Sequence, residues 1–190
     1  MAAEKDDAGR GRAAGVQGLC MPAARETKFR YVLCTSVNDE IVHGMPSQKR
    51  VLKSGDIVFD RYRRAVERIL RRFGHHRARW ARFSEETARL MEVTRESLEM
   101  AIEKARPGNR LFDICGTVER HVTANGFSVV REFVGHGIGT QMHEEPQIPN
   151  YVDRRSENPR LKEGMVLAIE PMVNAGNARQ PGACRYAGPR

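Results

Sequence analysis

Apolar residues in the second half of the chain recur at the spacing of two consecutive helices. Ser84 is a suitable N-cap, two acidic residues follow it, and apolar positions recur until Pro107 and Gly108 end the segment. The residues expected to form the inward face of this helix are Leu90, Met91, Leu98, Ile102 and Ala105. The residues that predict a second helix, closed by Asn125 and Gly126, are Leu111, Ile114, Val118 and Val122.

Three short apolar runs predict strands around this helical pair. Residues 51–58 are β-branched or aliphatic on both sides of a turn-like centre, residues 127–134 alternate, and residues 165–169 follow the turn at Gly164. The sequence therefore predicts an α+β fold.

A basic block, residues 59–83, separates the first predicted strand from the helical pair. It contains nine arginines and only two acidic residues, so it carries +7 of the formal net charge of +8. The apolar residues within it that recur at helical spacing are Tyr62, Ala65, Val66, Ile69, Leu70 and Phe73. This period predicts an amphipathic helix ending at Gly74, and two interpretations of the block stay open: a helix packed on the core, or a surface that binds RNA phosphates.

Composition excludes several classes of protein. No apolar run approaches the roughly 20 residues that span a bilayer, and residues 1–12 lack the apolar core of a secretory signal, so a cytoplasmic location is expected. The four cysteines are far apart, which argues against a disulfide framework or a zinc knuckle. Residues 1–27 show no sustained period and are expected to be a disordered leader.

Candidate catalytic and metal-binding residues lie at the ends of two predicted strands. His136 lies between Gly135 and Gly137, where the missing side chains would let a metal ion or a substrate approach, and His143 follows. Glu170 ends the run 165–169, and a carboxylate there is costly unless it is paired or metal-bound. A structural histidine and a solvent-exposed glutamate are the alternatives.

Five segments, residues 34–46, 51–58, 132–139, 142–146 and 165–176, closely resemble the type I methionine aminopeptidases, in the same order. The resemblance implies a pita-bread fold, incomplete here, with a catalytic domain over 28–176 and a tail unlike the family over 177–190. It also implies removal of the initiator methionine from nascent polypeptides, contact with the ribosome, and a monomer.

The resemblance assigns a role to each candidate residue. His136 and Glu170 resemble metal ligands, and Glu170 would also position the attacking water. His143 resembles the residue that binds the scissile peptide, and His43 a second histidine that contacts the substrate. Cys34 and Met142 resemble further substrate-binding positions. The family uses two divalent ions, which could be manganese, iron, cobalt or zinc.

The basic block departs from the family pattern. The family carries an aspartate three residues after the strand that ends at Val58 and a second one eleven residues later, whereas Asp60 lies two residues after Val58. The second position falls near Arg71 or Arg72. Asp60 is therefore interpreted as a surface or N-cap residue.

Three of the five expected metal ligands are thus missing, because residues 177–190 also contain no acid for the last one. Impaired or absent activity is predicted, and a noncatalytic module that binds RNA or the ribosome is an alternative. The 25 residues between Val58 and Ser84 match the spacing of the family, so out-of-frame translation of a damaged gene is a third hypothesis.

Overall fold

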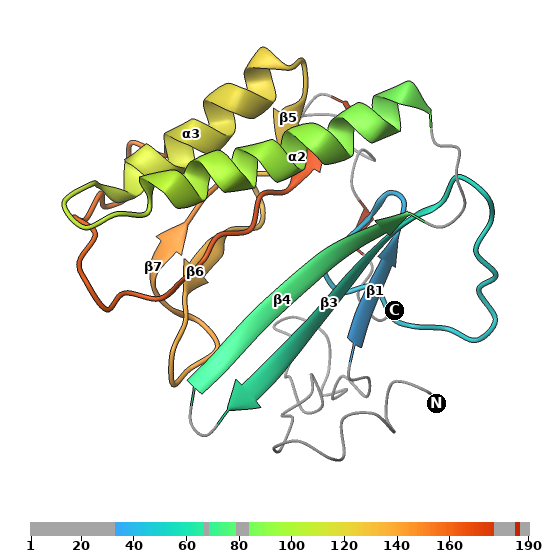
Figure 1. Cartoon of the computed structure of the whole chain (residues 1–190), viewed down its shortest axis with the longest axis horizontal. Helices are drawn as coiled ribbons and strands as arrows, with labels where there is room; N and C mark the ends of the chain where they lie inside the picture. The colour runs from blue at the N-terminus through green and yellow to red at the C-terminus, as the bar shows by residue number, and fades with distance from the viewer. Residues whose placement is uncertain (1–32, 67–68, 79–83, 177–184, 187–190) are drawn as a thin grey trace. The chain divides into compact units, whose positions relative to one another are not determined.

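The computed structural model describes residues 33–66, 69–78, 84–176 and 185–186. The chain divides into two compact units, one formed by residues 1–83 with 184–190 and the other by residues 84–183. Each unit is considered by itself (Figure 1). The expected leader, 1–27, and most of the tail, 177–190, lie outside the described residues.

The N-terminal unit is built around an antiparallel sheet with the strand order β1-β3-β4. Strand β1 (Leu33–Val37) pairs with the first half of β3 (Ile57–Val66), and β3 pairs along its whole length with β4 (Ile69–Ala78). Strand β2 (Glu40–Ile41) pairs in parallel with β10 (Arg185–Tyr186). Asn38, with φ of 55°, fixes the end of the β1–β3 ladder, because its side-chain oxygen accepts a hydrogen bond from the amide of Ile57 at 3.0 Å.

The amphipathic helix predicted for the basic block is wrong, because this region forms the β3–β4 hairpin. Tyr62 is opposite Phe73, Ala65 is opposite Leu70, and the strands are antiparallel. The strand predicted over 51–58 is also corrected: only its last two residues belong to β3, and Asp56 donates a backbone hydrogen bond to Lys53 in the preceding turn.

The predicted helical pair is confirmed in the second unit. Helix α2 (Glu85–Lys104) begins at the N-cap Ser84, whose hydroxyl accepts a hydrogen bond from the amide of Thr87 at 3.1 Å. Helix α3 (Leu111–Ala124) ends at the C-cap Asn125. The two helices lie side by side (Figure 1).

The inward face of α2 differs from the prediction. Its buried residues are Val93, Ser97 and Ala101, whereas Ile102, which was expected to be inside, is 55% exposed. The prediction followed the largest apolar side chains, but two helices in close contact favour small residues at four-residue spacing. Ala105 is exposed because it is the C-cap that follows α2, and Leu90, Met91 and Leu98 are only partly buried.

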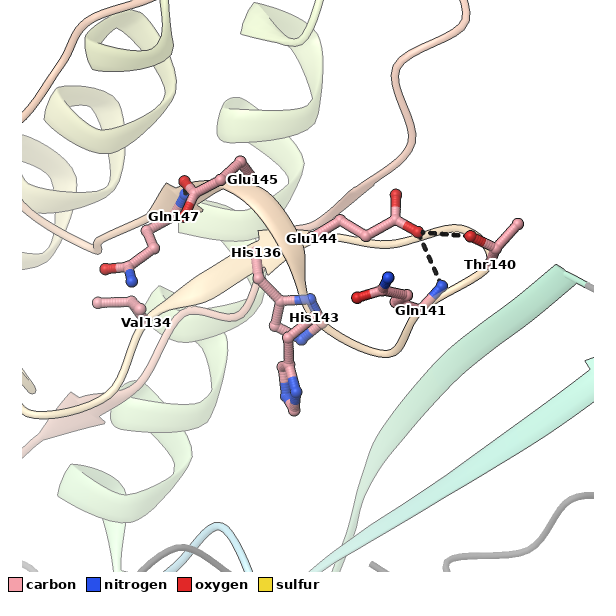
Figure 2. A pocket seen from close by; sticks show the side chains of 8 residues that line it. All are labelled: Val134, His136, Thr140, Gln141, His143, Glu144, Glu145 and Gln147. Atoms are coloured by element: carbon pink, nitrogen blue, oxygen red, sulfur yellow. Dashed lines mark hydrogen bonds between the residues drawn. The ribbon is translucent and has the colours of Figure 1, made fainter.

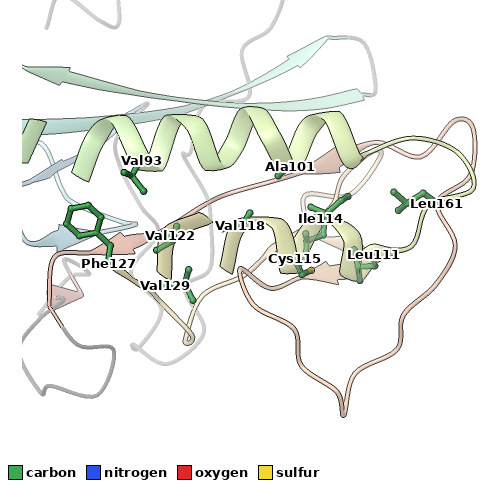
Figure 3. Close-up of a cluster of buried hydrophobic side chains, with 11 residues drawn as sticks. Val93, Ala101, Leu111, Ile114, Cys115, Val118, Val122, Phe127, Val129 and Leu161 are labelled. Atoms are coloured by element: carbon green, nitrogen blue, oxygen red, sulfur yellow. The ribbon is translucent and has the colours of Figure 1, made fainter. Parts of the chain in front are cut away.

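Short strands pack against the helices and complete the core of this unit. Strand β5 (Ser128–Val129) pairs with β9 (Val173–Asn174), and β6 (Gly135–Gly137) lies between β7 (Glu144–Ile148) and β8 (Leu167–Ala168). The predicted strands 127–134 and 165–169 are thus present but much shorter. Side chains from the two helices and from these strands form one buried cluster (Figure 3). Within the described residues, the helices lack the combination of length and apolar composition needed to cross a membrane.

Candidate functional site

His136 is the centre of the candidate site. It lies in β6 and is 5% exposed, and its Nδ1 is 2.7 Å from the carbonyl oxygen of Gly137. A carbonyl oxygen only accepts hydrogen bonds, so Nδ1 carries a proton and Nε2 is the ring nitrogen left to bind a metal ion or a second proton. Histidines that bind metals are commonly held in this way, with one ring nitrogen bonded to the backbone and the other directed at the ion.

Glu170 lies next to His136. Its buried Oε1 is 3.4 Å from Nε2 of His136, and the two side chains are 16% and 6% exposed. A carboxylate oxygen and an unprotonated imidazole nitrogen both accept hydrogen bonds, so their close approach in a buried place favours a positive charge between them. Either a proton or a metal ion supplies that charge, and imidazole with carboxylate suits a divalent transition metal.

Asn150 was not identified from the sequence, yet it holds the segment that carries Glu170. Its side chain is 1% exposed, and its Nδ2 donates a hydrogen bond to the backbone oxygen of Glu170 at 2.9 Å. Nothing in the sequence distinguishes this residue, because an asparagine after a proline is typical of any loop.

His143 comes from the loop that joins β6 to β7. Its ring meets the ring of His136 edge to face, with 4.4 Å between the centroids and an interplanar angle of 68°. Both histidines line a pocket of about 720 Å³ (Figure 2). The other residues that line it are Val134, Thr140, Gln141, Glu144, Glu145 and Gln147. The structure therefore brings His136, His143 and Glu170 together in the second unit.

Gly135 and Gly137, beside His136, were expected to leave room for a metal ion or a substrate, but the structure gives another reason for them. A Cβ on Gly135 would lie 2.3 Å from the carbonyl oxygen of Ala168, and a Cβ on Gly137 would lie 2.3 Å from that of Glu145. These glycines therefore admit the backbones of neighbouring segments, rather than leaving space for a substrate.

Cys34 and His43 lie together in the N-terminal unit, with 3.9 Å between the sulfur of Cys34 and Nδ1 of His43. The buried hydroxyl of Ser36 accepts a hydrogen bond from the amide of Gly44 and contacts the carbonyl of Val42, which ties the segment that carries His43 to β1. Met142 lies in the loop before His143, is half-buried, and is not among the residues that line the pocket.

Asp60 is neither a surface residue nor an N-cap, which corrects the interpretation from sequence. It is half-buried in the middle of β3, in register with Thr35 and His75. The next residue, Arg61, stands three positions after Val58, pairs with Cys34 and is only 4% exposed. A buried guanidinium thus occupies the position at which the resemblance expects a carboxylate. Within the described ranges, no group of three or more His, Cys, Asp or Glu side chains is arranged to hold a metal ion.

Comparison with known proteins agrees with these features. Residues 9–187 match metallopeptidase family M24. The chain is 47% identical over 153 residues to the methionine aminopeptidase of Clostridium acetobutylicum and 46% identical over 154 residues to methionine aminopeptidase 1 of Bacillus subtilis. Each match covers 78% of this chain, and the chain spans 58% and 59% of these two relatives.

A solved structure of methionine aminopeptidase from Thermotoga maritima superposes with a TM-score of 0.75 at 40% identity, covering 80% of this chain and 60% of that one. The mixed α and β architecture is thus the pita-bread fold of these enzymes, as the sequence predicted. The match across most of its residues and the shared fold place the chain in metallopeptidase family M24.

Proposed function

We propose that this chain acts as a methionine aminopeptidase, which hydrolyses the peptide bond after an N-terminal methionine. The observation that carries the proposal is the buried pair of His136 and Glu170, with Nε2 and Oε1 3.4 Å apart, beside the pocket that His143 lines. The relatives named methionine aminopeptidase support the same activity.

His136 and Glu170 would hold a divalent ion of manganese, iron, cobalt or zinc, two ions per site being the family's arrangement. Such an ion polarises the substrate carbonyl and lowers the pKa of water. The Nδ1 bond to Gly137 keeps the ring of His136 in the orientation that presents Nε2. The carboxylate of Glu170 can position the attacking water and accept its proton.

The remaining assignments concern the substrate. His143 is exposed on the wall of the pocket, where its ring can donate a hydrogen bond to the carbonyl oxygen as negative charge develops on it. Cys34, His43 and Met142 are proposed to contact the substrate, which would be the N-terminus of a nascent polypeptide. A cytoplasmic location and a monomeric state remain predictions.

Low activity is part of the proposal. Arg61, a buried cation, stands at the position in the sequence where the resemblance expects a metal-binding carboxylate, so the chain lacks this ligand. Because loss of a residue that merely supports a ligand typically costs about 10–100-fold, turnover at least about 100-fold below that of an intact relative is expected.

A metal titration by calorimetry, run beside turnover of a Met-Ala-Ser peptide, tests the proposal. We expect binding of Mn²⁺ or Co²⁺ to be lost in His136→Ala and retained in His121→Ala. His121 is a matched control, because it lies in α3 and pairs with Glu96 at 2.9 Å. Equal metal binding by His136→Ala would refute the assigned site, and near-normal turnover by the unchanged chain would refute the predicted impairment.

A second candidate function is favoured by the register of the β3–β4 hairpin. Arg63 is the cross-strand partner of Arg72 and Arg64 that of Arg71, so residues of like charge are paired at two successive positions of the register. Such pairs are destabilising unless anions lie near them, which suits the phosphates of RNA or of the ribosome. Affinity for a model RNA that falls steeply with salt supports this function, and affinity that does not change with salt excludes it.

Out-of-frame translation of residues 59–83 also remains a hypothesis. Resequencing the gene tests it, since an uninterrupted reading frame through these codons would exclude it.

A further inference from the structure

The loop between β6 and β7 carries His143, and two of its residues donate hydrogen bonds to the carboxylate of Glu144. Oε1 of Glu144 accepts a hydrogen bond from the amide of Gln141 at 2.8 Å and another from the hydroxyl of Thr140 at 3.3 Å (Figure 2). Both donors lie in the loop, whereas the backbone of Glu144 belongs to β7, where it pairs with Gly137. The side chain therefore ties the loop back to the sheet.

Gly139 fits the same arrangement from the opposite side. A Cβ at this position would lie 2.9 Å from Oε2 and 3.1 Å from Oε1 of Glu144, so the absence of a side chain makes room for the carboxylate. The amide of Gly139 also donates a hydrogen bond to the carbonyl of Gln141 at 3.2 Å, which closes the loop on itself. The loop is thus arranged around the carboxylate group.

This arrangement matters because His143 is exposed and directly precedes Glu144. Its ring stands 4.4 Å from that of His136, and an exposed side chain keeps such a position only when its backbone is fixed. The hydrogen bonds to Glu144 are the side-chain contacts that restrain this backbone beside His143.

We propose that Glu144 is a positioning residue, whose carboxylate sets the backbone of residues 139–143 so that the imidazole of His143 faces the pocket beside His136. The proposal rests on the function proposed above for His143, since it says how that imidazole is kept in place. Glu144 itself is assigned no contact with substrate or metal.

The test measures the geometry directly in the full chain, without metal or turnover. Ring protons of His136 and His143 are close enough for a nuclear Overhauser cross-peak in the unchanged protein. We expect Glu144→Ala to abolish this cross-peak and Glu144→Gln to keep it, because an amide oxygen can still accept the hydrogen bond from Gln141. Glu145→Gln is the charge-matched control and should keep it as well, because that carboxylate bonds to Gln147 in β7 rather than to the loop.

Gly139→Ala is an independent variant that removes no hydrogen-bonding group. The φ of Gly139 lies outside the left-handed region, so alanine fits the backbone and acts only by displacing the carboxylate. We expect the cross-peak to be lost here too. A cross-peak of unchanged intensity in both Glu144→Ala and Gly139→Ala would overturn the proposal, even if the first variant were destabilised.

A kinetic readout separates this proposal from the proposed function. With metal-loaded protein, Glu144→Ala should lower kcat by about 10-fold or more and change KM less, with Glu144→Gln restoring most of the loss. Loss of the cross-peak without loss of kcat would support the positioning role and overturn the catalytic role assigned to His143.

Discussion

Replacing Gly135 with alanine should destabilise the second unit and disturb the candidate site at once. The added Cβ would lie 2.3 Å from the carbonyl oxygen of Ala168 and 3.3 Å from that of Ile148. Both obstacles are backbone atoms of the neighbouring strands, so β8 would have to move by about 1 Å to restore van der Waals contact. His136 pairs with Ala168, so the shift also changes the distance between His136 and Glu170.

The magnitude follows from the cost of overpacking, about 1–3 kcal/mol in a packed interior. A rigid obstacle on each side places this variant at the upper end, about 3 kcal/mol, which corresponds to a fall in Tm of about 6–12 °C for a chain of 190 residues. Metal affinity should fall by at least about 10-fold because the two ligands separate. Thermal unfolding by circular dichroism and a calorimetric metal titration measure the two effects.

Gly116→Ala is the matched control, since it makes the same chemical change within α3 of the same unit. Its Cβ would meet Nη1 of Arg120 at 2.9 Å and a methyl group of Val152 at 3.1 Å, both on side chains that can move. The gain of about 1 kcal/mol from placing alanine in a helix offsets this crowding, so Tm should change little. Equal Tm values for Gly135→Ala and Gly116→Ala would refute the reasoning.

Three further predictions concern charge and burial. Burial alone would raise the pKa of Glu40, but its hydrogen bonds and the charge of Arg50 lower it, so the unfolded chain binds the proton more readily. The pair should therefore contribute up to about 1 kcal/mol at pH 7 that is lost as the pH falls below about 4. Arg50→Gln should reduce this loss in urea titrations, and the hydrogen bond from the Val37 amide to Glu40 accounts for what remains. Burial raises the pKa of Cys115 to about 12, so iodoacetamide at pH 8 should label this thiol in urea but not in the folded chain, as peptide mass spectrometry would show. Arg71→Glu should raise the free energy of unfolding in urea by about 0.2–1 kcal/mol, since it gives Arg64 a cross-strand partner of opposite charge. If the block were the helix predicted from sequence, residues 64 and 71 would be seven positions apart on it and the gain would be small.

Sequence reasoning succeeded where local signals agree with the tertiary structure. The start of α2 at Ser84 and the end of α3 at Asn125 are set by capping chemistry, which depends on neighbouring residues only. The meeting of His136 and Glu170 was expected because both end predicted strands and both resemble ligands of one metal centre. Their roles as ligands stay predictions, since proximity alone does not show what binds.

The residues that were missed act through contacts that appear only in the folded chain. Asn150 bonds to Glu170, twenty residues away, and Glu144 is recognisable only once the loop is folded around it. The small residues on the inner face of α2 were also missed, because their burial depends on the packing of α3 against α2. Hydropathy ranks side chains by size and polarity, and none of these positions stands out on either scale.

The basic block shows how one pattern can predict two structures. Residues 62–73 are nearly a mirror image about Glu67 and Arg68, so apolar positions recur three or four residues apart and imitate a helix. In the hairpin the same symmetry places apolar residues opposite apolar ones, as with Tyr62 and Phe73, and arginine opposite arginine. Neither Glu67 nor Arg68 is a typical residue of a tight hairpin turn, so no local signal favoured the strand. Residues 58–62 of β3 also pair with β1, more than twenty positions away in the sequence, and such a long-range pairing leaves no local signal in the block itself.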